Sequence, residues 1–307
     1  MNFIQQAYKG KNDWWRYIIT IAIVMSPFIL NFVMYLVLPE LFKQLYKDME
    51  NFQGNKNLFL LENLFPFVVL LVFLFLFVKF LHQRSVTSLV TSRSKIDWKR
   101  VFYAFGLWFF ISIVFLAIGI YMDSDSLIWN FKPIPFLFLV LISLVFLPLQ
   151  TSLEELLFRG YLMQGLGVLV KNRWVPLLIT SVLFGLLHSL NPEVEKLGYG
   201  IMVFYIGTGL LFGITTLVDE GTELALGMHA ANNIMAAIFV TANWTAFQTD
   251  ALYIDTSEPS LGWETYFPVF ILYPIVLLIL SKKYGWKNWQ EKLFGKIEKP
   301  TLITEEN

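Results

Sequence analysis

The stretch "IPFLFLVLISLVFLPLQTSLEELLFRGYL" (residues 134–162) places a long apolar run directly before two carboxylates and an arginine. Residues 134–152 carry no charge and nearly reach the length of about 20 apolar residues that spans a bilayer. A shorter apolar segment, residues 156–170, follows the charged residues and either lies at the membrane interface or continues the same helix. The stretch therefore predicts a membrane-spanning helix with a charged motif where that helix ends or turns.

The composition of the whole chain supports a membrane protein. Of its 307 residues, 56% are hydrophobic and 15% are charged, whereas soluble domains carry about a quarter charged residues. The absence of cysteine excludes disulfides, thiolate metal sites and a cysteine nucleophile. The zero formal net charge gives no indication of a nucleic-acid partner.

Apolar runs of spanning length recur along the chain. We find eight, at about 17–38, 59–81, 101–121, 134–152, 175–190, 201–218, 224–242 and 264–281. They predict an all-α fold, a polytopic membrane helix bundle of about eight transmembrane helices that forms a single integral membrane domain over residues 1–307.

The distribution of basic residues predicts the orientation. With eight alternating spans, sixteen Lys and Arg residues outside the motif fall on the side of the two termini and five fall on the other side. Positive charge accumulates in cytoplasmic loops, so both termini should be cytoplasmic, including a basic tail at about 282–307. We interpret this tail as a positive-inside signal rather than an interfacial helix. The compact single-domain form suggests a bacterial plasma membrane.

Few ionisable side chains lie within the predicted spans, where such groups usually face a cavity or a partner. One of the three histidines, His82, lies beside a basic loop, and we expect it at the surface. The polar residues that remain are Glu154, Glu155, Arg159, His188, His229, Asn232 and Asn233.

Helical spacing separates the two glutamates. Glu155 and Arg159 are four residues apart, so they share a helix face and can pair. Glu154 points about 100° away from Glu155 and is left to face a cavity.

The same spacing relates the residues of the other two motifs. His229 and Asn233 share a face and can donate toward one point, whereas Asn232 projects elsewhere. Phe184 precedes His188 by one turn on one face. A carboxylate beside a histidine can deprotonate a water, and a second histidine with an amide can stabilise an oxyanion, so these residues suit hydrolysis.

The three motifs together resemble a known family. "EELLFRG" (154–160), "FGLLH" (184–188) and "HAANN" (229–233) are similar to the motifs of the CPBP intramembrane proteases, which include CAAX prenyl proteases and bacteriocin-processing enzymes. The resemblance covers about residues 150–235. It implies a helix bundle that encloses an intramembrane catalytic cavity, and we place the catalytic core at about 134–242.

The resemblance also implies a role for each motif residue. Glu154 and His188 would activate a water molecule. His229 and Asn233 would stabilise the oxyanion.

Glu155 and Arg159 would position the motif helix. No H-E-x-x-H zinc motif is present, and we favour a site without a metal or other cofactor. Zinc held by Glu154, His188 and His229 remains the alternative, because two histidines and a glutamate form a known catalytic zinc set.

The sequence thus predicts an intramembrane endopeptidase, a CAAX-type hydrolase that acts on a hydrophobic, prenylated or bacteriocin-like peptide. Its partners would be membrane lipid and a peptide or lipidated-peptide substrate. Two alternatives are a non-catalytic immunity or scaffold protein with the same fold, and a transporter with a proton relay.

The predicted spans leave one conflict of depth. Glu154 and His229 would lie near the cytoplasmic side, whereas His188 would lie about 20 Å into its span. Either Pro148 breaks the fourth span or the fifth span starts below the membrane and tilts.

Overall fold

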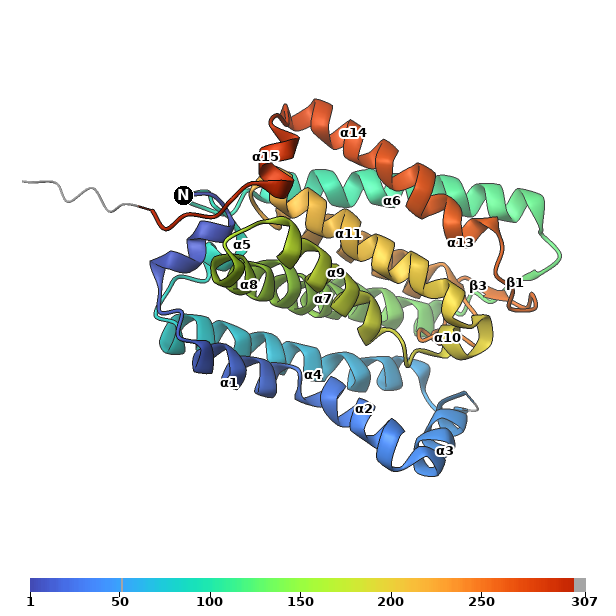
Figure 1. Ribbon diagram of the computed structural model, residues 1–307. Helices are drawn as coiled ribbons and strands as arrows, with labels where there is room; N and C mark the ends of the chain where they lie inside the picture. The colour runs from blue at the N-terminus through green and yellow to red at the C-terminus, as the bar shows by residue number, and fades with distance from the viewer. Residues whose placement is uncertain (51, 301–307) are drawn as a thin grey trace, which may run out of the picture.

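The computed structural model describes residues 1–50 and 52–300, and it forms one bundle of roughly aligned helices (Figure 1). The main α-helices are α1 (Trp14–Val24), α2 (Ser26–Val37), α3 (Pro39–Glu50), α4 (Lys56–Leu76), α5 (Thr87–Val90), α6 (Trp98–Met122), α7 (Pro133–Glu155), α8 (Met163–Val170), α9 (Trp174–Leu187), α10 (Pro192–Leu197), α11 (Met202–Asp219), α12 (Glu223–Ile238), α13 (Trp263–Phe267), α14 (Tyr273–Tyr284) and α15 (Trp289–Phe294). The all-α membrane bundle predicted from the sequence is confirmed.

The predicted count of eight spans is not confirmed. Among the described residues, five helical segments are long and apolar enough to cross a membrane: Lys56–Leu81, Trp98–Met122, Pro133–Val170, Tyr199–Asp219 and Thr265–Tyr284. The bent pair α1 and α2 gives a sixth if it counts as one span. Helices α9 and α12 occupy the two remaining predicted positions with only 14 and 16 residues.

The predicted end of the fourth span at residue 152 is wrong. Helix α7 continues through a π-helical segment, Leu156–Leu162, into α8, which gives one 38-residue helix. Pro148 lies inside α7 and does not end it. The charged motif is therefore in the interior of a long helix, and residues 156–170 continue that helix.

A sharp bend separates α1 from α2. The two helices meet at Met25 at an angle of 67°. Pro27 follows the bend within the first turn of α2, where its ring prevents a continuous helix from passing through. Helix α2 has no buried residue, so it leans away from the bundle, as Figure 1 shows.

Helix α12 lies at the centre of the bundle, packed against α6, α7 and α11. Helix α11 also packs on α9, and one glycine at the α11–α9 contact and another at the α12–α6 contact allow these helices to approach closely. A Cβ on Gly209 would lie 2.7 Å from the Ser181 carbonyl oxygen, and a Cβ on Gly227 would overlap the carbonyl oxygen of Val101 on α6. The contacts of α12 with α7 and of α9 with the segment Leu156–Leu162 bring the three sequence motifs together.

A small sheet, which was not predicted, closes the end of the bundle opposite the termini (Figure 1). Strand β3 (Tyr253–Asp255) lies between β1 (Leu127–Trp129) and β2 (Val240–Thr241). It pairs antiparallel with β1 and parallel with β2.

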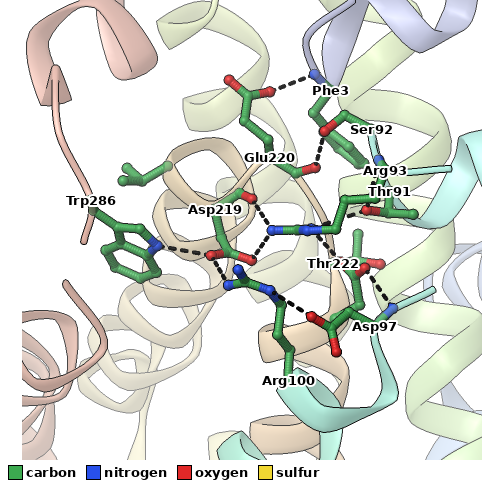
Figure 2. A network of polar contacts seen from close by, with 12 residues as sticks. Phe3, Thr91, Ser92, Arg93, Asp97, Arg100, Asp219, Glu220, Thr222 and Trp286 are labelled. Atoms are coloured by element: carbon green, nitrogen blue, oxygen red, sulfur yellow. Dashed lines mark hydrogen bonds and ion pairs between the residues drawn. The ribbon is translucent and has the colours of Figure 1, made fainter. Parts of the chain in front are cut away.

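An ionic network ties the other end together around the turn between α11 and α12 (Figure 2). The Asp219 carboxylate, 4% exposed, accepts hydrogen bonds from Arg100 Nη1 at 2.6 Å, Trp286 Nε1 at 2.8 Å and Arg93 Nη2 at 2.9 Å. Glu220 beside it accepts from the Phe3 backbone N–H at 2.5 Å.

Glu220 also reaches the α8–α9 turn and the tail. It pairs with Arg173 at 3.2 Å and with Lys292 at 3.5 Å. The segments that the sequence assigned to one side of the membrane therefore meet at this turn. Residues 301–307 of the predicted basic tail lie outside the described residues.

The surface position expected for His82 is wrong. Its ring is fully buried, with Nδ1 2.8 Å from the Lys11 carbonyl oxygen and Nε2 2.6 Å from the Tyr161 hydroxyl. Burial is the main cause that lowers the pKa of His82, to about 4. The neutral ring therefore fastens the N-terminal segment to the motif helix.

Candidate active site

The long helix Pro133–Val170, which we call the motif helix, resolves the difference in depth predicted between Glu154 and His188. Glu154 precedes Val170 by 16 residues, or about 24 Å of helix, and His188 follows Trp174 by 14 residues, or about 21 Å. Because only residues 171–173 join α8 to α9, both side chains lie at a similar depth in the bundle. The site is thus formed inside the bundle rather than at its edge.

Glu155 and Arg159 form a fully buried ion pair. Arg159 Nη1 donates to Glu155 Oε1 at 2.9 Å, and both side chains are 0% exposed. Arg159 Nη2 also donates to the Gly209 carbonyl oxygen at 3.1 Å, and its guanidinium lies 4.2 Å from the Phe184 ring centroid. The pair therefore connects the motif helix to α9 and α11.

His229 lies between the two glutamates. Its Nδ1 is 2.8 Å from Glu155 Oε1, and its Nε2 is 3.7 Å from Glu154 Oε2. An ionised carboxylate only accepts hydrogen bonds, so Nδ1 carries the hydrogen toward Glu155. Nε2 consequently faces Glu154, and the ring is held in this orientation by stacking on Phe212 at 5.1 Å.

The sequence reasoning missed Gln150, which connects the Glu154 carboxylate to the Asn233 amide. Its Nε2 donates to Glu154 Oε1, and its Oε1 accepts from Asn233 Nδ2 at 2.9 Å. His229 Nδ1 and Asn233 Nδ2 therefore have different partners, Glu155 and Gln150. The four-residue spacing between Gln150 and Glu154 is the signal that could have identified it.

Glu154 keeps one carboxylate oxygen without a hydrogen-bond partner. The side chain is 8% exposed, and Oε2 is buried and unbonded apart from its approach to His229. An unbonded buried acceptor in a polar site is a candidate position for a water molecule or a substrate group.

His188 caps the end of α9. Its Nδ1 is 2.9 Å from the Phe184 carbonyl oxygen, which can only accept, so Nδ1 carries the hydrogen and Nε2 carries the lone pair. Its ring stacks on Tyr205 at 4.5 Å with an interplanar angle of 19°. The Phe184 ring lies 5.0 Å from His188 and 5.7 Å from His229, so one aromatic side chain contacts both histidines.

The zinc alternative does not fit this arrangement. Within residues 1–50 and 52–300, no three His, Asp or Glu side chains converge to hold a metal ion. The set Glu154, His188 and His229 is thus not assembled as a ligand group.

Comparison with known proteins agrees with the motifs. The family model of Rce1-like type II CAAX prenyl endopeptidases matches residues 133–235, which include all three motifs. The match over this segment is consistent with the CPBP family. The family supports a CAAX-protease-type hydrolase, and the apolar helices support an integral membrane protein.

One curated relative extends the similarity beyond residues 133–235. The uncharacterized protein YyaK of Bacillus subtilis (strain 168) is 28% identical over 280 residues, which cover 88% of this chain and 93% of that protein. No solved structure matches the chain.

Proposed function

We propose that this protein is an intramembrane endopeptidase that uses Glu154 and His188 to activate a water molecule. The observation that carries the proposal is the free Oε2 of Glu154, buried beside His229 while Gln150 occupies the other oxygen. A base in this position can accept the proton of a water that attacks a peptide carbonyl.

The other side chains suit the remaining steps. The lone pair on His188 Nε2 can accept a hydrogen bond from the same water. His229 would stabilise the oxyanion through Nε2, and Asn233 would do so through its second amide hydrogen. Glu154 then returns its proton to the leaving amine, and water is consumed as one peptide bond is broken. Glu155 and Arg159 position the motif helix.

We propose one integral membrane domain with its catalytic core at about residues 134–242 and with both termini in the cytoplasm of a bacterial cell. The substrate would be a hydrophobic peptide, prenylated or bacteriocin-like. Membrane lipid would surround the helix bundle.

The test is cleavage of candidate peptides by the purified protein in detergent or liposomes. Glu154→Gln and His188→Ala should each abolish cleavage, while Glu62→Gln, on the exposed surface of α4, should not change it. Parallel reactions with a zinc chelator, followed by zinc addition, test the metal alternative. Unchanged cleavage in Glu154→Gln would refute the proposed base, and full biological activity of that variant without any cleavage would favour a scaffold.

A further inference from the structure

Four hydrogen bonds in series connect α6 to the Glu154 carboxylate. Trp108 Nε1 donates to Asn232 Oδ1 at 3.3 Å, and Asn232 Nδ2 donates to Asn233 Oδ1 at 3.1 Å. Asn233 Nδ2 donates to Gln150 Oε1 at 2.9 Å, and Gln150 Nε2 donates to Glu154 Oε1. We call these three amides and the indole the amide relay.

The two ends of the amide relay fix its direction. An indole N–H can only donate, and an ionised carboxylate can only accept, whereas each amide has one accepting and one donating end. With Trp108 at one end, Asn232 must present its oxygen there and its NH₂ to Asn233. The same alternation carries through to Gln150, whose NH₂ then faces Glu154. The opposite orientation would set donor against donor at Trp108 and acceptor against acceptor at Glu154.

We propose that Trp108, Asn232 and Gln150 are positioning residues that hold the Glu154 carboxylate through this relay. This inference rests on the proposed function of Glu154 as the base. Gln150 occupies Oε1 and so selects Oε2 as the oxygen that receives the water proton. The relay uses one amide hydrogen of Asn233 and leaves the other for the oxyanion.

The surroundings of the relay keep it in place. Trp108 is 5% exposed and packs on Tyr273, with ring centroids 5.9 Å apart. Gln150 is 6% exposed. Helix α12, which carries both asparagines, is held close to α6 by Gly227, where a side chain would overlap the Val101 backbone. The relay therefore connects three tightly packed helices, α6, α12 and α7.

The kinetic test uses Gln150→Met, which keeps the size of the side chain and removes both hydrogen bonds. We expect kcat to fall about 10- to 100-fold with KM within about twofold, because a misplaced base affects the chemical step rather than binding. Trp108→Phe keeps an aromatic ring and should lower kcat less, by about 3- to 10-fold. Ser143→Ala, a buried α7 hydroxyl without a partner, is the matched control and should retain wild-type kcat.

A spectroscopic test does not depend on activity. In protein labelled with ¹⁵N on its tryptophan indoles, the Trp108 signal is the one lost in Trp108→Phe. Gln150→Met, three bonds along the relay, should shift that signal, and Ser143→Ala should leave it in place. Trp98→Phe, at a 60% exposed position, should remove only its own signal.

The outcomes separate the two proposals. Wild-type protein that cleaves, a dead Glu154→Gln variant and a fully active Gln150→Met variant would overturn the relay and leave the proposed function standing. A shifted Trp108 signal in a protein without any peptidase activity would support the relay and overturn the function. An unshifted signal in Gln150→Met would overturn the relay in either case.

Discussion

Replacement of Asp219 by alanine should strongly destabilise the end of the bundle where the termini meet. The substitution removes the acceptor for Arg93, Arg100 and Trp286 in the network of Figure 2. Loss of one partner of a buried ion pair lowers stability by about 3–5 kcal/mol.

The contacts that remain in Asp219→Ala place the expected loss of stability near the lower end of this range. Arg93 retains Glu223 at 3.2 Å, and Arg100 retains Asp97 at 3.2 Å, so neither guanidinium is left without a carboxylate. Their side chains are 26% and 18% exposed, so water partly solvates them. We therefore expect Asp219→Ala to lower the free energy of unfolding by about 3 kcal/mol.

The assay is reversible unfolding of the purified protein in mixed micelles with increasing SDS, followed by far-UV circular dichroism. Glu40→Ala is the control, because the Glu40–Lys43 pair is 87% and 72% exposed and such pairs add little stability. A loss of less than about 1 kcal/mol in Asp219→Ala would refute the reasoning, since it would mean that the network adds no more than a surface pair.

Three further predictions address packing, pH and orientation. Gly209→Ala should lower stability by about 1–3 kcal/mol in the same assay, whereas Gly106→Ala, where a Cβ meets nothing within 4 Å, should cause no loss. Because burial lowers the pKa of His82 to about 4, the unfolded chain binds a proton that the folded chain does not. Stability should thus fall as the pH drops from about 6.5 toward 4, and a His82→Gln variant with the same pH dependence would contradict this. Since the chain has no cysteine, single cysteines at Asp125 and Lys287 can be labelled on intact cells with an impermeant maleimide. Only the cysteine at position 125 should react, and the reverse pattern would contradict cytoplasmic termini.

Hydropathy predicted the positions of the helices well, because lipid-facing helices are apolar along most of their length. It failed at residue 152, where Glu154, Glu155 and Arg159 suggested an interface. Inside the bundle these charges are neutralised by contacts with one another and with His229, and a local hydropathy window contains no information about such contacts.

The candidate site was predictable where chemistry is concentrated in motifs and not where it depends on tertiary contacts. Glutamate and histidine in an apolar chain are conspicuous, whereas Gln150 carries no charge and lies outside the three motifs. The contact between Trp108 and Asn232 joins residues 124 positions apart, and helical spacing cannot reveal it. The same limit applies to the turn at Asp219, whose partners come from three other segments.

The bend between α1 and α2 has a consequence for the choice of host membrane. Helix α2 contacts α4 through the rings of Phe28 and Phe67, 5.9 Å apart, but it buries none of its residues and so exposes most of its surface to lipid. A helix in this situation adjusts its tilt to the thickness of the hydrocarbon layer. We therefore expect reconstitution into short-chain and long-chain lipids to change the angle at Met25 while α4 and the motif helix stay fixed, so that bilayer thickness becomes a variable to control in every measurement on this protein.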